Sequence, residues 1–214
     1  MNKSALLVDF HSYIPYYKIK GDTIMFKQLF IDTETTGLDA EKNGILNIGG
    51  LVRIGDVASE PFDFFGQPFK TDEVSLEALK VNQTTKEMID SYQSAEDLYS
   101  EFHTFLDKFI DKYDKRDKFF FYGWNADFDD RFLRAFFKKN KDKYYGSYIL
   151  WPSINVAALL IDTLKELRFN ISDFHLDTAA KFMGLEVDEE KRHSAYYDAE
   201  LTMKVYDLIR KGVK

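Results

Sequence analysis

Residues 27–38, KQLFIDTETTGL, predict a buried strand that ends in two acids and a turn. The apolar run LFI leads directly into Asp32 and Glu34. Side chains alternate between the two faces of a strand, so these two carboxylates point the same way, about 7 Å apart along the strand. Thr35, Thr36 and Gly37 then supply the chemistry of a turn, which ends the strand.

Two carboxylates on one face of a strand end repel each other, and burying them ionised is costly without a cation or a donor. One hypothesis is therefore a divalent-metal site. The alternative is an edge strand that carries two solvated acids, which is the commoner outcome for an isolated Asp-x-Glu. Further acids later in the chain decide between the two.

The composition limits the kinds of protein and site that are possible. With 214 residues, of which 45% are apolar and 16% aromatic, the chain is long enough for one domain with a full core. It has no cysteine, so any metal must bind oxygen or imidazole ligands, which suits Mg²⁺ or Mn²⁺. The net charge of −7 argues against a non-specific duplex binder. No run approaches the roughly 20 apolar residues of a membrane span, so we expect a cytoplasmic protein without a membrane partner.

Hydrophobic periodicity predicts a single α/β domain over residues 25–214. The expected strands are 26–32, 45–54 and 61–68, joined as an antiparallel meander, and a central strand at 118–122. A Gly49-Gly50 pair in the second strand indicates a bulge. Residues 1–24 are interpreted as an N-terminal extension or edge arm, although their tyrosines and lysines could also stack bases.

Two later acids lie on predicted inward helix faces. A helix from about 127 to 140 buries Phe132 and Phe136, which places Asp129 on the inner side of its first turn. By the same pattern Asp127 is interpreted as the N-cap and Asp130 as a solvated acid.

A helix from about 194 to 210 has Leu201, Val205 and Leu208 at +3, +7 and +10 from Asp198, so Asp198 also faces inward. On that helix His193 would lie about 140° away, so it approaches Asp198 only from a preceding loop.

If both helices pack near the end of the first strand, four carboxylates converge. Two divalent cations, roughly 3.5–4 Å apart, would hold such a cluster and serve phosphoryl chemistry. His193, with an ordinary pKa near 6.5, would suit as the base that takes a proton from water.

Three short motifs resemble those of a known family. DTETTG at 32–37, NADFD at 125–129 and HSAYYDA at 193–199 are similar to the three exonuclease motifs of the DEDDh family of 3′–5′ exonucleases, which includes the proofreading (epsilon) subunit of bacterial DNA polymerase III. The resemblance implies a ribonuclease-H-like fold, a mixed five-stranded sheet with helices on both faces. Only four strands are clear from the sequence, and the fifth is expected near 148–151.

The resemblance also implies residue roles. Asp32, Glu34, Asp129 and Asp198 match the metal ligands, and His193 matches the general base. A sister group has a tyrosine four residues before the last acid, where this chain has Ser194. The expected contacts with the 3′-terminal nucleotide are Thr35, Thr36, Gly37, Leu38 and Asn125.

The activity that this implies is removal of nucleoside monophosphates from the 3′ end of single-stranded or frayed DNA, with two Mg²⁺ or Mn²⁺ ions and with a DNA polymerase as the suggested partner. Trimming of RNA ends is an open alternative, because nothing in the sequence reveals readout of the 2′-OH. A nucleic-acid-binding domain without activity is a third alternative, against which the complete set of acids argues.

Overall fold

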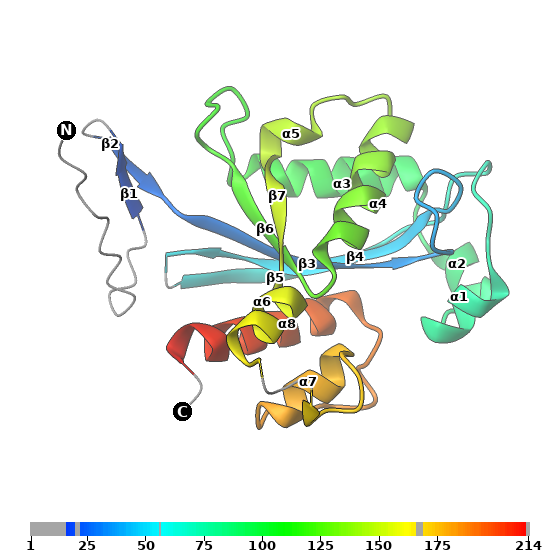
Figure 1. Ribbon diagram of the computed structural model, residues 1–214. Coiled ribbons are helices and arrows are strands. Elements are labelled where there is room, and N and C mark those ends of the chain that lie inside the picture. Colours follow the sequence, from blue (N-terminus) through cyan, green and yellow to red (C-terminus); the bar gives the residue numbers. More distant parts are fainter. Residues whose placement is uncertain (1–15, 20–21, 56, 166–168, 213–214) are drawn as a thin grey trace.

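The computed structural model describes residues 16–19, 22–55, 57–165 and 169–212. Its centre is a five-stranded sheet in the order β5-β4-β3-β6-β7. The first three strands in sequence form an antiparallel meander, and the last two run parallel to β3 (Figure 1). The strand bounds are β3 Lys27–Thr35, β4 Ile45–Ile54, β5 Val57–Phe65, β6 Phe119–Gly123 and β7 Ile149–Asn155. The expected mixed sheet is confirmed, and β7 is the fifth strand, longer than the short apolar run indicated.

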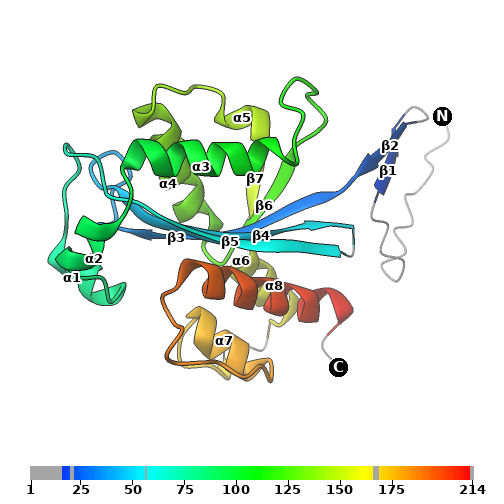
Figure 2. The same ribbon diagram turned by 180° about the vertical axis from the view of Figure 1, so that it is seen from behind.

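Helices cover both faces of the sheet (Figures 1 and 2). One layer holds α3 (Ala95–Asp107), α4 (Ala126–Lys139) and α5 (Tyr145–Tyr148), and the other holds α6 (Val156–Thr163), α7 (Leu176–Phe182) and α8 (Ala195–Lys211). The short helices α1 (Leu76–Val81) and α2 (Lys86–Ser91) lie beyond the end of β3.

Strand β3 contributes to both cores because its side chains alternate. Leu29 and Ile31 pack into the cluster under α3 and α4, whereas Phe30 packs against α8, where it stacks on Tyr122. Asp32 is in phase with Phe30, so it faces the α8 side, as does Glu34. The alternation predicted from the sequence therefore fixes the layer into which both acids point.

Helix α8 lies very close to the sheet at Gly49. This glycine lies opposite Asp32 in regular pairing with β3, so the predicted bulge at Gly49-Gly50 is wrong. A Cβ added at Gly49 would lie 2.1 Å from the backbone nitrogen of Tyr196, in the first turn of α8. The glycine is present because the backbone of the helix approaches the strand so closely.

We expect Gly49→Ala to push the start of α8 away from the sheet. The overlap is with backbone, so relief requires a shift of the helix, at a cost of about 1–3 kcal/mol of unfolding free energy. Thermal melts measure the cost. Gly146→Ala is the matched control, because a Cβ there meets nothing within 4 Å. Equal melting temperatures for the two variants would contradict this account of the packing.

Two local predictions about α4 are wrong. Asp127 is not the N-cap, because the helix begins one residue earlier and Asn125 precedes it. Asp130 is buried, not solvated, and accepts hydrogen bonds from the Tyr145 hydroxyl (2.8 Å) and from Arg134 (2.6 Å). The i,i+4 spacing of Asp130 and Arg134 was visible in the sequence, whereas Tyr145 belongs to the separate helix α5 and could not be anticipated.

Part of the predicted N-terminal arm, residues 1–15, 20 and 21, lies outside the described residues. The described part, β1 (Tyr16–Ile19) and β2 (Asp22–Met25), forms an antiparallel hairpin separate from the five-stranded sheet. None of the helices in the described ranges has the length and apolar character that spanning a membrane requires.

Candidate active site

The end of β3 extends past its neighbour β6. The backbone edge of β3 beside the two acids therefore has no β6 residue paired with it. The last pair between the two strands is Phe30 with Tyr122, so β3 residues from Ile31 onward have no partner on that side. Asp32 and Glu34 are half-buried in this section. Strand β4 pairs with the other edge through both positions, which holds the two acids on a rigid element.

Asp129 reaches β3 from the first turn of α4. Its carboxylate accepts hydrogen bonds from the backbone N–H of Thr33 (3.0 Å) and from the Thr33 hydroxyl (2.8 Å). The backbone donor is one that β6 leaves without a strand partner, so Asp129 satisfies it. These two bonds fix the buried Asp129 carboxylate beside Asp32.

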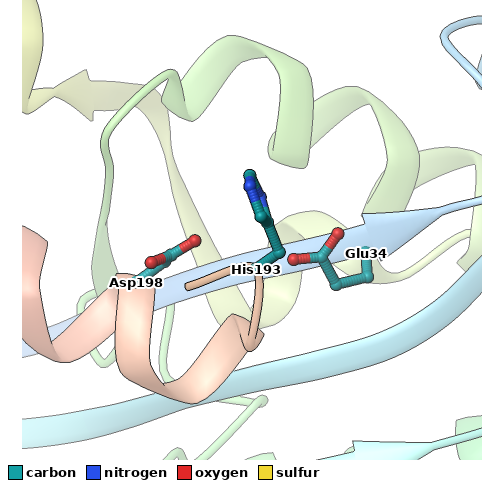
Figure 3. Close-up of side chains that lie close together, drawn as sticks. All are labelled: Glu34, His193 and Asp198. Carbon is teal, nitrogen blue, oxygen red and sulfur yellow. The ribbon is translucent and has the colours of Figure 1, made fainter. Parts of the chain in front are cut away.

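His193 and Asp198 come from the turn before α8 and from its first turn (Figure 3). His193 has a left-handed backbone (φ 62°). Ligand atoms of Glu34, His193 and Asp198 all lie within 4.8 Å of one another. His193 thus approaches the acids from the loop, as predicted, because its backbone conformation turns the chain just before the helix starts.

Burial raises the pKa values of all four acids, and the charges of the other acids of the cluster raise those of Asp32 and Glu34 further. Burial comes first in each case, and it raises the pKa of Glu34 to about 8, that of Asp129 to about 7 and that of Asp198 to about 6. The pKa of Asp32 is raised well above its ordinary value, by burial and then by the charges of the other three. A divalent cation fits this donor set, because oxygen ligands suit Mg²⁺ and Mn²⁺ and its charge offsets the repulsion.

We expect the metal-free protein to lose stability as pH rises from 5 to 8. The folded-state pKa values lie above those of the unfolded chain, near 4, so the native state binds more protons and its stability declines as pH rises through the raised values. The expected loss is at least about 1–2 kcal/mol, or roughly 2–8 °C in melting temperature.

Melting curves in EDTA at several pH values measure this loss, and Mg²⁺ should reverse it most at pH 8. Asp32→Asn is the matched comparison, because asparagine keeps the shape and cannot ionise. An equally steep decline in the variant would show that the acids of the site are not its source.

The predicted substrate residues fall into two groups. The Thr35 hydroxyl donates to the carbonyl of Gly37 inside the turn (2.7 Å), and the Thr36 hydroxyl donates to the carbonyl of Glu73 in the segment before α1 (2.6 Å). Gly37 is buried as well. Leu38 and Asn125, by contrast, have exposed side chains, and Leu38 is 80% exposed. The structure therefore brings two of the five to the surface and uses the others to shape the turn.

A cavity of about 600 Å³ opens beside the acids. Asn125, His193 and Asp198 line it, and so do the aromatic residues Trp124 and Phe174. Arg192 also borders the cavity and pairs with Asp177 (3.3 Å) and Glu189 (2.9 Å), which ties the His193 loop to α7. The cavity therefore gives a small molecule access to Asp198 and His193.

Sequence reasoning missed two supporting residues. Thr33 orients Asp129, and Asn47 accepts a hydrogen bond from the Ala195 N–H (3.3 Å) while it donates to Asp63 (2.7 Å). The position of Thr33 could have predicted this role. A residue between Asp32 and Glu34 on a strand faces the opposite layer, and the threonine hydroxyl can donate a hydrogen bond there. Asn47 gave no signal, because its partners lie far away along the chain.

A mixed β5-β4-β3-β6-β7 sheet, helices on both faces and a carboxylate cluster at the end of the central strand define a ribonuclease-H-like nuclease fold. Within that class, the family model described as Exonuclease (RNase_T) matches residues 29–206. The chain belongs to this family, the DEDD-type 3′–5′ exonucleases, as the three motifs predicted.

Relatives and solved structures agree with this assignment. The PolC-type DNA polymerase III of Thermotoga maritima is 29% identical over 176 residues, which is 82% of this chain and 11% of that protein. Ribonuclease T of Buchnera aphidicola subsp. Baizongia pistaciae is 24% identical over 85% of this chain and 82% of its own length. The chain thus spans about a ninth of the polymerase.

E. coli exonuclease I in complex with a dT13 oligonucleotide has the same fold. Its TM-score is 0.69 at 17% identity, covering 88% of this chain and 42% of that one. Cell-death related nuclease 4 gives 0.65 at 14% identity, covering 87% of this chain and 64% of that one.

Proposed function

We propose that this protein removes nucleoside monophosphates, one at a time, from the 3′ end of single-stranded or frayed DNA, in proofreading or DNA processing. The observation that carries the proposal is the meeting of Glu34, His193 and Asp198 within 4.8 Å, beside Asp32 and Asp129. A protein gains no stability from four repelling acids, so their retention supports a catalytic role. For the same reason we reject a binding domain without activity.

In this proposal each residue has a defined task. Asp32, Glu34, Asp129 and Asp198 hold two Mg²⁺ or Mn²⁺ ions, which when bound supply positive charge to the departing 3′ oxygen and make water a better nucleophile. His193 takes the proton from the attacking water, which requires the neutral imidazole. Burial first, and then the nearby Arg192, lower the pKa of His193, which favours that neutral form.

In this proposal Leu38 and Asn125 contact the terminal nucleotide, because both side chains are exposed, one after the turn that ends β3 and the other at the start of α4. Thr35, Thr36 and Gly37 contribute the backbone of the turn. In this proposal only an unpaired end reaches the acids, so a duplex must fray first. Fraying costs a few kcal/mol and least at a mismatch, which suits proofreading.

DNA is proposed over RNA because the PolC-type relatives are DNA polymerases and exonuclease I has been solved with a DNA oligonucleotide. The same comparison with PolC supports a DNA polymerase as partner. Trimming of RNA ends is the second candidate, since the match to ribonuclease T covers most of both chains.

The test uses DNA and RNA oligonucleotides of one sequence, labelled at the 5′ end, with Mg²⁺, Mn²⁺ or EDTA. We expect a ladder that shortens by one nucleotide at a time on DNA, with either metal and not with EDTA. Faster shortening of the RNA would favour the second candidate. Internal cleavage, or full activity in EDTA, would overturn the proposal.

A further inference from the structure

His193 faces the acids from a backbone conformation that few residues adopt (Figure 3). Its φ of 62° lies in the left-handed region, where a side chain with a Cβ costs free energy that the surrounding structure must offset. The residue belongs to the loop between α7 and α8 and directly precedes Ser194, the N-cap of α8. The contacts of its neighbours in the chain therefore decide how firmly the imidazole is placed.

On the C-terminal side of His193 the chain is fixed to the sheet. The side chain of Ser194 makes no cap hydrogen bond, so the first turn of α8 lacks the usual local acceptor. Asn47 of β4 supplies an acceptor instead, because its side-chain oxygen receives the N–H of the buried Ala195 (3.3 Å). His193 is thus two residues away from a point that the central sheet holds.

On the N-terminal side of His193 the chain is fixed to α7 by Arg192. The guanidinium pairs with Asp177 in the first turn of α7 (3.3 Å) and with Glu189 in the loop itself (2.9 Å). Arg192 and Asp177 also line the cavity that His193 lines. Of these two ion pairs, the one with Asp177 connects the loop to another element of the fold.

An exposed ion pair that adds a little stability is the simpler explanation of this contact. It fits the pair Lys181–Glu189 between α7 and the same loop, whose side chains are 51% and 55% exposed, because such pairs contribute little. It fits Arg192–Asp177 less well, since these side chains are only 33% and 17% exposed. Both charges also act on His193: burial and then Arg192 lower its pKa, and Asp177 raises it.

We propose that Asp177 is a positioning residue for His193. Through Arg192 it holds the chain on one side of His193, as Asn47 holds it on the other, and the two anchors keep the imidazole turned toward the acids. This inference rests on the proposed function, because it concerns the base of that reaction. A base that moves freely is within reach of the attacking water for less of the time, so misplacement lowers the rate of proton transfer and leaves substrate binding unchanged.

The test is Asp177→Asn, which keeps the shape of the side chain and removes its charge. The assay uses the 5′-labelled DNA oligonucleotide with Mg²⁺ at pH 8, where the imidazole is neutral in every variant. We expect kcat to fall about 10-fold and KM to stay within about 2-fold of the wild type. Arg192→Gln should give the same loss, whereas Arg192→Lys keeps the charge and should retain most of the rate. Asp177→Asn/Arg192→Gln should lose no more than either single variant.

Lys181→Gln is the matched control. Lys181 also lies on α7 and also joins the loop, through Glu189 (2.5 Å), but in an exposed pair. Its kcat should not change. An equal loss in Lys181→Gln, or an unchanged kcat in Asp177→Asn, would overturn the proposal.

A double-mutant cycle separates positioning from general stability. Asparagine at position 193 tolerates the left-handed backbone but cannot act as the base. In a His193→Asn background, Asp177→Asn should therefore change the remaining rate by less than about 2-fold. Losses that multiply would show that Asp177 acts on the fold or on the acids instead of through His193, and the proposal would be wrong.

Amide hydrogen exchange separates this proposal from the proposed function, because it requires no turnover. In the substrate-free protein, residues 188–193 should exchange faster in Asp177→Asn than in the wild type or in Lys181→Gln, and α8 should exchange equally in all three. That result would support the anchor even if the protein cleaved neither DNA nor RNA. Equal exchange of the loop in all three proteins would reject the anchor even if the enzyme were an active exonuclease.

Discussion

Asp32→Asn is expected to reduce exonuclease turnover by roughly 10³-fold or more. Asp32 is surrounded by the charges of Glu34, Asp129 and Asp198, so its removal affects the whole proposed metal site. Charge stabilisation by a bound cation contributes several kcal/mol to the transition state, and each 1.4 kcal/mol is a factor of ten in rate. Single-turnover assays on a 5′-labelled oligonucleotide at saturating Mg²⁺ measure the loss.

The fold should survive this change. Asparagine removes a buried repulsion as well as a ligand, so the metal-free variant should melt at a higher temperature than the metal-free wild type at pH 8. Asp127→Asn is the matched control, because Asp127 is an exposed acid in the first turn of α4, two residues from Asp129. Wild-type turnover in Asp32→Asn, or a loss of similar size in Asp127→Asn, would remove Asp32 from the mechanism.

Much of this site could be predicted from the sequence because it depends on local periodicity. Two acids in alternation after Phe30 must share a face, and an acid in phase with Leu201 and Val205 must point inward. Both rules hold in the structure, where Glu34 and Asp198 meet. These inferences need only the geometry of a strand or a helix, which the surrounding fold seldom changes.

What the sequence could not supply depends on distant packing. Gly49 suggested a bulge, yet the reason for the glycine is the backbone of α8, almost 150 residues later. Asp130 was assigned to solvent, but α5 provides a tyrosine that buries it. In both cases the partner comes from another element, so no pattern within one segment could reveal it.

His193→Asn is expected to lower the rate by roughly 10²–10⁴-fold, the usual contribution of a general base. Asparagine is the appropriate replacement, because it tolerates the left-handed backbone that His193 adopts (φ 62°), whereas alanine adds backbone strain to the loss of the imidazole. The cluster of acids should stay in place, so the variant should keep its affinity for a 12-nucleotide single strand and its stabilisation by Mg²⁺. A drop in turnover with unchanged binding would therefore report on proton transfer.

The pH profile provides the second part of this test. The imidazole must be neutral to accept a proton, so activity falls as the medium becomes acidic. Burial and Arg192 lower the pKa of His193, so kcat/KM should hold its plateau below pH 6.5 before it declines. The acids of the site also bind protons at low pH, but they are still present in His193→Asn. Any part of the acidic decline in rate that is lost in this variant is therefore due to the imidazole. In the variant only water is left to accept the proton, and it does so inefficiently. Added imidazole should therefore restore part of the rate. A variant with the wild-type rate and an unaltered pH profile would show that another group accepts the proton.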